Sequence, residues 1–583
     1  MEYIYYIFGF FLLIWVFTVG QACMRFSLLR LKEIEIELIE RDDLPEYLAP
    51  VFEAAEKFLF SQGFEYSHSI RFTSMFVHDD LPNYSMIFFH PATQSYADAR
   101  PGQLPDWHSS FEITYSTFFS DDTSIQTIDC LIHSLPPVPD EFGYSDEFAA
   151  DPKKQWDLHQ KRHNSLKDKD TITISPEKYT EHIRSLSKKL LDIKKKDTWF
   201  KPAEKKGLLR LRYKKLFTYA RQVTAGNKKR FAAIKTASTV KLSQDQISAK
   251  EIADADALYR VIHTHRQLQY GKDAKLVIFG ISALLFFIIF GIVFEFDFLF
   301  AAILLVVVLI HELGHLIGMI LFGYKNRQVM FIPMMGAVTT GREENVKPFH
   351  KMIVYLLGPV PGIIIGIACL FLTASTGSIF WLKTSLFFII INYLNLLPVN
   401  PFDGGRIVEL LFFSRFPRAR FCFWLASTVA FAAGAWAMDD PIMIGISVFL
   451  VMALQWHWRF GNAEYQIRKI IKKDAGEKDR LLAICRILAR PPYDKFALAN
   501  KIQTAKTISQ HLSSVKPGIA TIVAGTLIYG MLLVPPIYIA TNYEKSLSYL
   551  KTSVRKYMKK ENTDTEKELG KIKHRDEIRH RFG

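Results

Sequence analysis

The chain has 583 residues, of which 49% are hydrophobic and 22% are charged, and its formal net charge is +15. This composition excludes a disordered, collagen-like or low-complexity protein. The positive charge is local, because residues 184–235 alone hold 18 Lys and Arg residues against three acids. Five widely spaced cysteines without a CxxC pair argue against a secreted, disulfide-rich domain.

An apolar run at residues 4–19 opens the chain, and no basic residue precedes it. A cleaved signal peptide carries basic residues before its apolar run, so this run is not predicted to be one. Arg25, Arg30 and Lys32 follow the run. The positive-inside rule therefore predicts a transmembrane anchor at residues 1–23 whose C-terminal end faces the cytoplasm.

Residues 24–274 are accordingly predicted to form a cytoplasmic α+β domain. Residues 45–62 have the pattern of one amphipathic helix. Residues 65–134 alternate between apolar and polar side chains, which predicts an antiparallel sheet. Residues 176–268 are basic and are predicted to be helical.

The basic segment 184–235 suggests anionic lipid as a partner. Within it, residues 208–220 have the pattern of a basic amphipathic helix, which lies either on a lipid surface or with one face in water. Nucleic acid is not the expected partner, because the chain has no zinc-finger or recognition-helix pattern. The residues give no prediction of oligomeric state.

Seven further apolar runs have the length that crosses a bilayer. They lie at residues 276–294, 298–322, 352–373, 379–399, 421–438, 441–457 and 517–540. With the first run they predict a mainly α-helical polytopic membrane protein of about eight spans, carrying the α+β cytoplasmic domain. We divide the remaining chain into a transmembrane core at 275–460, a cytoplasmic helical segment at 461–516, a last transmembrane run at 517–540 and a charged tail at 541–583.

The third run contains His311-Glu312-Leu313-Gly314-His315. An ionisable side chain in mid-bilayer costs about 2.5–3.5 kcal/mol, so three in five residues need a strong functional reason. Four residues apart on a helix, the two histidines face the same way and are spaced to bind one Zn²⁺. Glu312 flanks this position, where it can accept a proton from zinc-bound water as the general base.

A catalytic zinc needs a third protein ligand and an open fourth position. Asp403 lies in Asn395-Leu-Leu-Pro-Val-Asn-Pro-Phe-Asp403-Gly-Gly, at the predicted cytoplasmic end of another span. The third run ends on the same predicted side, so Asp403 is placed at a depth that suits the same metal. The alternative is an ordinary carboxylate at a helix end.

These two motifs together resemble the site-2 protease family of intramembrane zinc metalloproteases, which pairs HExxH with a later NxxPxxxxDG. The resemblance covers residues 276–410 and implies a site-2 protease-like core. It implies that His311, His315 and Asp403 bind one Zn²⁺ and that Glu312 is the general base. It also implies that Asn395 holds the substrate or the developing oxyanion.

Two weaker likenesses follow the first motif. Phe331–Val338 resembles the family's membrane re-entrant β-loop, which gives Gly336 a substrate-binding role, whereas the alternative is a plain loop between spans. Gly358-Pro-Val-Pro-Gly362 resembles a GPxxN feature, but Gly362 stands where Asn is usual. Because of this departure no role is assigned to the segment, and helix packing is the alternative.

We therefore expect a metalloendopeptidase that hydrolyses a peptide bond in or near a transmembrane segment of a membrane-protein substrate, in regulated proteolysis. We expect a multi-pass protein of a bacterial inner or cell membrane, with its active site toward the cytoplasmic side. The alternatives are a zinc-dependent membrane hydrolase of a non-peptide substrate, and a non-catalytic binding or transport protein with a structural metal.

Overall fold

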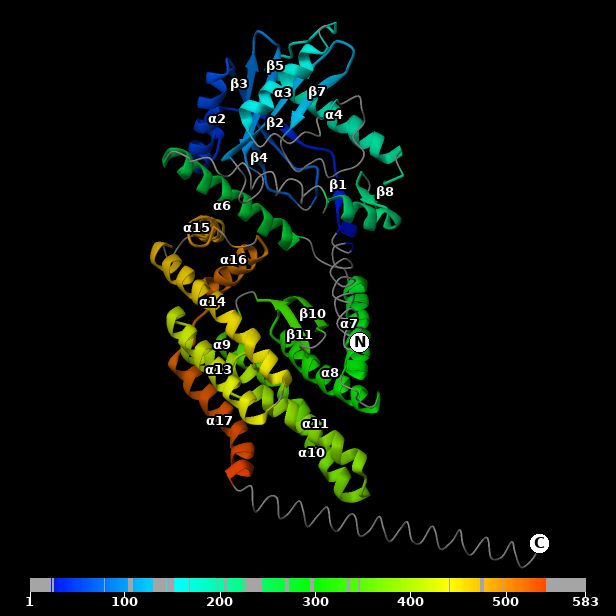
Figure 1. Cartoon of the computed structure of the whole chain (residues 1–583), viewed down its shortest axis with the longest axis vertical. Coiled ribbons are helices and arrows are strands. Elements are labelled where there is room, and N and C mark those ends of the chain that lie inside the picture. Colours follow the sequence, from blue (N-terminus) through cyan, green and yellow to red (C-terminus); the bar gives the residue numbers. More distant parts are fainter. Residues whose placement is uncertain are drawn as a thin grey trace, which may run out of the picture. The chain divides into compact units, whose positions relative to one another are not determined.

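The structure is a computed structural model that describes residues 23–541 with internal gaps. The gaps are residues 24–25, 78, 103–108, 129–142, 144–150, 167, 197, 204–206, 224, 226–243, 268–271, 294–297, 333–335, 344–345, 440, 472–475, 495 and 497. The chain divides into two compact units (Figure 1). The first unit joins Met1–Ala274 to Ala463–Leu512, and the second joins Lys275–Asn462 to Ser513–Gly583.

The first unit is built around a six-stranded antiparallel sheet in the order β2-β3-β4-β5-β6-β7. The strands are β2 (Ile36–Ile39), β3 (Glu65–Phe72), β4 (Asn83–His90), β5 (Ser95–Pro101), β6 (Phe111–Phe118) and β7 (Ser124–Ile128). Each strand pairs with the next along the chain. This confirms the antiparallel sheet that the alternating pattern predicts.

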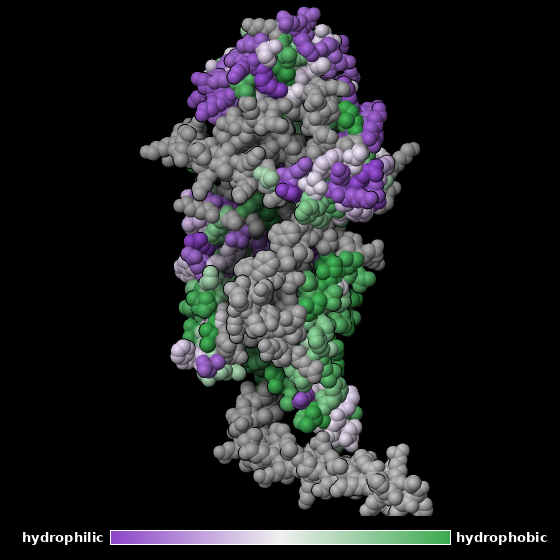
Figure 2. All heavy atoms as spheres, turned by 45° about the vertical axis from the view of Figure 1, so that its right-hand side comes forward, coloured by the Kyte–Doolittle hydropathy of each residue, from purple (hydrophilic) through white to green (hydrophobic). Residues whose placement is uncertain are grey.

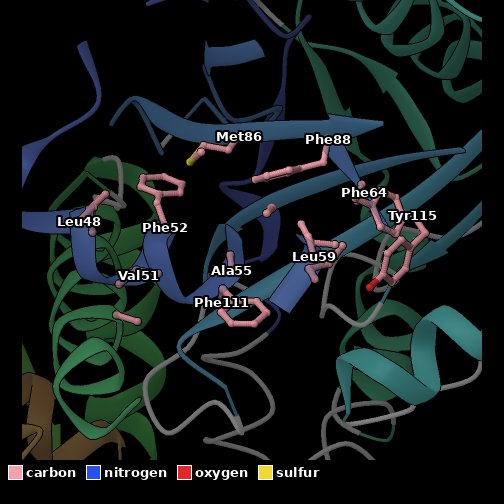
Figure 3. Packing of buried hydrophobic residues seen from close by; sticks show 14 of the residues in the cluster. Leu48, Val51, Phe52, Ala55, Leu59, Phe64, Met86, Phe88, Phe111 and Tyr115 are labelled. Atoms are coloured by element: carbon pink, nitrogen blue, oxygen red, sulfur yellow. The ribbon is translucent and has the colours of Figure 1, made fainter. Parts of the chain in front are cut away.

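Helices cover both faces of this sheet. Helix α2 (Ala49–Ser61), which lies within the predicted helix at 45–62, packs on one face together with α3 (Pro152–Asn164) and α6 (Gln244–Gln267). Figure 3 shows Phe52 and Leu59 of α2 beside Met86 and Phe88 of β4. Helix α4 (Pro176–Lys196) covers the other face.

A second, three-stranded sheet corrects the prediction that residues 176–268 are helical. It consists of β1 (Arg30–Leu31), β9 (Leu209–Leu211) and β8 (Phe200–Pro202), in that order. Buried residues alternate with more exposed ones here, as in a strand: Leu209 and Leu211 are buried and Arg210 between them is not. The predicted helix at 208–220 is thus a strand at its start, followed by a 3-10 turn at Tyr213–Lys215 and a helix at 216–223.

The separate segment 463–512 completes the first unit. Its helices α15 (Glu477–Leu488) and α16 (Leu498–Ser513) follow the end of α14 (Pro441–Ile470), and α15 packs against α6. Arg490 Nε lies 2.8 Å from Glu251 Oε2 of α6. The fully buried Glu464 binds Arg468 at 2.6 Å and His511 at 3.0 Å. Two parts of the chain that the sequence analysis separates are therefore one folded unit.

The described residues of the second unit are helical apart from one hairpin and the connecting turns. Its elements are α7 (Lys272–Val293), α8 (Phe298–Leu321), β10 (Lys325–Ile332), β11 (Gly336–Arg342), α9 (Pro348–Leu357), α10 (Pro359–Thr376), α11 (Ile379–Leu396), α12 (Asp403–Val408), a π-helical turn at Glu409–Phe413, α13 (Pro417–Met438), α14 and α17 (Ile519–Thr541). Figure 2 shows hydrophobic side chains over the exposed faces of helices in this unit. Exposed apolar residues such as Phe371, Trp436 and Met452 are typical of helices that face lipid.

Five helices among the described residues are long and apolar enough to cross a membrane: 298–321, 348–376, 379–396, 417–438 and 443–470. Each corresponds to a predicted run. The runs at 276–294 and 517–540 correspond to shorter apolar stretches, Lys275–Ile288 and Ile519–Val534. The predicted anchor run at 4–19 and tail residues 542–583 lie outside the described residues, so the count of eight spans stays a prediction.

Candidate metal centre

Helix α8 and the start of α12 bring three ligand-type side chains together. His311 Nε2 and His315 Nε2 lie 3.2 Å apart, and each lies 3.1 Å from Asp403 Oδ2. All three residues are buried. His311 and Asp403, which are 92 positions apart in the sequence, thus meet, as binding of one metal ion by both residues requires.

The outer nitrogens of both rings are held by hydrogen-bond acceptors. His315 Nδ1 lies 2.8 Å from the carbonyl oxygen of Val354, which can only accept, so this nitrogen carries the proton. His311 Nδ1 lies 2.9 Å from Asn392 Oδ1, while Asn392 Nδ2 donates to Phe388 O at 2.7 Å and so fixes the amide orientation. In neutral rings both Nε2 atoms therefore present lone pairs to the Asp403 carboxylate.

Three acceptors that converge in a buried space are the arrangement in which proteins hold a cation. The three donor atoms form a triangle with sides of 3.1, 3.1 and 3.2 Å. A tetrahedral zinc with ligands at about 2.0–2.1 Å needs its donor atoms about 3.3 Å apart. The residues fit one zinc ion with three protein ligands, and among the described residues they are the one group of His, Cys, Asp and Glu that is gathered in this way.

Glu312 lies next to this group and outside its triangle. Its side chain is buried, and Thr339 Oγ1 of β11 donates to Glu312 Oε2 at 2.6 Å. The same hydroxyl lies 3.1 Å from the backbone oxygen of Glu312. The hairpin β10–β11 therefore holds the carboxylate that the sequence analysis assigns as the general base.

Close helix packing around α8 depends on the glycine inside the HExxH motif. A Cβ atom at Gly314 would lie 1.8 Å from the carbonyl oxygen of Leu357, and one at Gly318 would touch Val354 and Leu357. Two small residues four apart let the end of α9 approach the backbone of α8. This approach places Val354 O against the ring of His315.

A tight turn carries the chain from α11 to Asp403. A Cβ atom at Gly404 would lie 2.1 Å from Leu396 O, so the turn folds back on the end of α11. Tyr529 of α17 donates a hydrogen bond to the same carbonyl. Helix α17 is thereby packed against the segment that positions Asp403, together with the apolar cluster around Met352 and Ile407.

The two predicted substrate-binding residues make contacts within α11 and within the β10–β11 hairpin. Asn395 Nδ2 donates to Ile391 O in its own helix at 3.0 Å. Gly336 begins β11 with a φ of +96° and pairs with Ile332 of β10. In the predicted β-loop, residues 331–332 and 336–338 therefore lie in an antiparallel hairpin, and the plain-loop alternative is wrong.

Asn392 contacts His311 and Thr339 contacts Glu312, and neither residue was predicted from the sequence. The signal for Asn392 was present, since it is an amide on an apolar span three residues before Asn395. Gly362 explains its position, because a Cβ atom there would lie 2.2 Å from the Asn392 amide nitrogen. The glycine that departs from the GPxxN pattern leaves the space that Asn392 fills.

Part of the chain is similar to a known protein family. Residues 299–379, which include His311 and His315, match the model of Peptidase family M50. The match confirms the resemblance to the site-2 protease family and supports a metalloprotease of that type. The site-2 protease from Methanocaldococcus jannaschii is similar at 22% identity over 30% of this chain and 88% of that chain, with a TM-score of 0.24. No curated protein matches the chain.

Proposed function

We propose that this protein is an intramembrane zinc metalloprotease that hydrolyses a peptide bond in or near a transmembrane segment of another membrane protein. One observation carries the proposal: the buried lone pairs of His311, His315 and Asp403 converge beside Glu312 in an apolar helix. A general base next to a three-ligand centre is the arrangement of a zinc hydrolase.

In the proposed reaction, His311, His315 and Asp403 hold the zinc. A zinc ion in this position supplies Lewis acidity toward water and toward the scissile carbonyl. Glu312 accepts the proton of the attacking water and passes it to the leaving amine. Thr339 keeps the Glu312 carboxylate in one orientation through the 2.6 Å hydrogen bond.

We assign substrate binding to the hairpin and to Asn395. A peptide bond inside a helix is shielded by its own hydrogen bonds, so the substrate must unwind before it is cut. An unwound segment can add to an exposed strand edge, and in the described part of the chain β11 pairs with β10 alone. Gly336 at the start of β11 leaves open space beside this strand, and Asn395 is assigned to the substrate carbonyl.

We further propose that the active site faces the cytoplasmic side of a bacterial inner or cell membrane and that the reaction belongs to regulated proteolysis. Support for the orientation comes from the basic residues Arg25, Arg30 and Lys32 after the first apolar run. Support also comes from the first unit, because two parts of the chain that the apolar helices separate fold together in it, as parts on one side of a membrane can.

The test compares membrane-protein fragments in cells that express the native chain or Glu312→Gln. The variant is expected to keep its zinc and to accumulate uncut substrate, because only the base is lost. His311→Ala serves as a second variant that loses zinc as well. Cleavage at the native rate by Glu312→Gln would contradict the assigned base. If Glu312→Gln leaves the protein fragments unchanged but alters lipids or other small molecules, a hydrolase of non-peptide substrates would be favoured. If neither the fragments nor the small molecules change, a structural metal would be favoured.

A further inference from the structure

The small sheet of the first unit carries a surface that is both basic and aromatic. We define the basic aromatic surface as the exposed residues Arg212, Tyr213, Lys214, Phe217 and Arg221. Tyr213 is 62% exposed and Phe217 is 50% exposed. Exposed aromatic side chains that are grouped on one surface are typical of an interaction site.

One side of the 213–223 segment forms this surface and the other side is buried. Leu216 and Tyr219 are buried in a cluster with Phe200, Leu209 and Leu211 of β8 and β9. Tyr213, Phe217 and Arg221 follow one another at intervals of four residues, so they share the opposite side. The buried side fixes the segment to the sheet, and the exposed side is therefore presented as a rigid surface.

The charge of this region has one sign. Residues 207–223 contain five Lys or Arg residues and no Asp or Glu. Lys201 and Arg210 also lie over the ring of Tyr213, each 5.5 Å from its centre. Positive charge around exposed aromatic rings is the pattern that binds an anionic lipid surface, in which rings enter the interface and cations meet headgroups.

The chain connects this surface directly to a predicted membrane anchor. Cys23 and Phe26 pack against the same buried cluster, and the ring centre of Phe26 lies 5.0 Å from that of Tyr219. The apolar run ends at residue 19, so four residues span at most about 14 Å from the run to Cys23. This part of the first unit is therefore tethered close to the bilayer.

We infer that the basic aromatic surface docks on the anionic headgroups of the membrane into which residues 4–19 insert. The predicted orientation places it at the cytoplasmic leaflet, which carries the anionic lipids. Docking at this point, in addition to the chain connection, holds the first unit in a fixed orientation on the bilayer. This inference does not depend on Glu312 or on the metal.

The test uses amide hydrogen exchange of the full chain in lipid nanodiscs. One set contains phosphatidylcholine alone, and the other contains about 30 mol% phosphatidylglycerol, because the attraction depends on lipid charge. We expect peptides that cover residues 209–221 to exchange about tenfold more slowly in the anionic discs. The difference is expected to disappear at about 1 M salt, where charges are screened within about 3 Å.

Lys214→Glu with Phe217→Ser is expected to abolish the difference between the two lipids. The matched control is Lys153→Glu with Lys154→Glu, two exposed residues of α3, which is expected to keep it. Native exchange of β6 in each variant shows that the fold is retained, and Arg221→Glu provides a milder variant if the double variant does not fold. Equal exchange of 209–221 in the two lipids would overturn the inference. Protection by an added single-stranded oligonucleotide, with none by anionic lipid, would overturn it in favour of nucleic acid.

Discussion

The side-chain oxygen of Asn392 lies 2.9 Å from Nδ1 of His311, on the side of the ring opposite to Asp403. This contact fixes which nitrogen of His311 faces the metal position. It is made by a residue of α11 that is fully buried. Helix α8, which carries both histidines, is thereby linked to α11 through a hydrogen bond as well as through apolar packing.

Asn392→Leu is expected to lower zinc affinity about 10- to 100-fold, as is usual when the partner of a metal-bound histidine is lost. The measurement is zinc titration of the purified protein against a competing chelator. Asn395→Leu is the matched control, because its amide binds a carbonyl of its own helix. Equal zinc affinity in the native chain and Asn392→Leu would contradict the role of Asn392.

Thr339→Val removes the hydrogen bond to Glu312 and leaves the three ligands in place. We expect the cleavage rate to fall about 10- to 100-fold, since a hydrogen bond to a charged group contributes about 1.5–3 kcal/mol. Zinc content is expected to stay at the native level. Thr340→Val is the control, because Thr340 faces Gln328 instead. A loss of zinc in Thr339→Val would show that the hairpin supports the fold and not the base.

Gly314→Ala is expected to separate α8 from α9, because the added methyl group would overlap with Leu357 O. Overpacking of this kind costs about 1–3 kcal/mol or more. The expected result is a lower yield of folded protein and a loss of zinc from the remainder, measured by size-exclusion chromatography and metal analysis. Gly434→Ala in α13 is the control, since nothing lies near its added Cβ atom. Native zinc content in Gly314→Ala would contradict the close approach.

Acid is expected to destabilise the first unit through His159. This side chain is fully buried between Thr117 Oγ1 at 3.0 Å and Thr127 Oγ1 at 2.9 Å. Burial lowers the pKa of His159 to about 3, from an unfolded value of about 6.5, and the nearby Arg162 adds to this effect. The unfolded chain therefore binds the extra proton between these two values. Neutral His159 therefore makes its full contribution to the free energy of unfolding above about pH 6.5, and this contribution is lost as the pH falls toward 3.

At pH 5 the expected loss from this one residue is about 2 kcal/mol in the free energy of unfolding. Pulse proteolysis in urea at pH 7 and pH 5, read on fragments from the 111–164 region, measures it. His159→Gln does not titrate, so its stability is expected to depend less on pH by this amount. The same pH dependence in both proteins would show that other groups cause the acid sensitivity.

Sequence was enough to predict the parts of the centre that a short motif encodes. His311, Glu312 and His315 are adjacent on one helix, so their relation follows from helix geometry alone. The predicted side of the membrane at which two spans end made Asp403 a candidate ligand, and the family resemblance implied that it binds the metal. The roles of Glu312, Asn395 and Gly336 in the reaction stay predictions.

The sequence did not predict which helices and strands contact one another. Asn392 and Thr339 reach the centre because of how α11 and β11 pack against α8, and a helix or strand pattern does not determine that packing. Strands β8 and β9 were missed because each has three residues, too few for an alternating pattern to stand out in a basic segment. The union of residues 463–512 with the N-terminal part depends on contacts such as Arg490–Glu251.

The discontinuous first unit ties the assembly of the protein to the completion of its synthesis. The surface of α6 that receives α15 is made before residues 275–462, yet α15 is made after them. The intervening helices must cross the bilayer an even number of times for the two parts to meet. A nascent chain therefore exposes the α15-binding face of its first unit until residues 275–462 have been made, and a product truncated before residue 463 retains that exposed face.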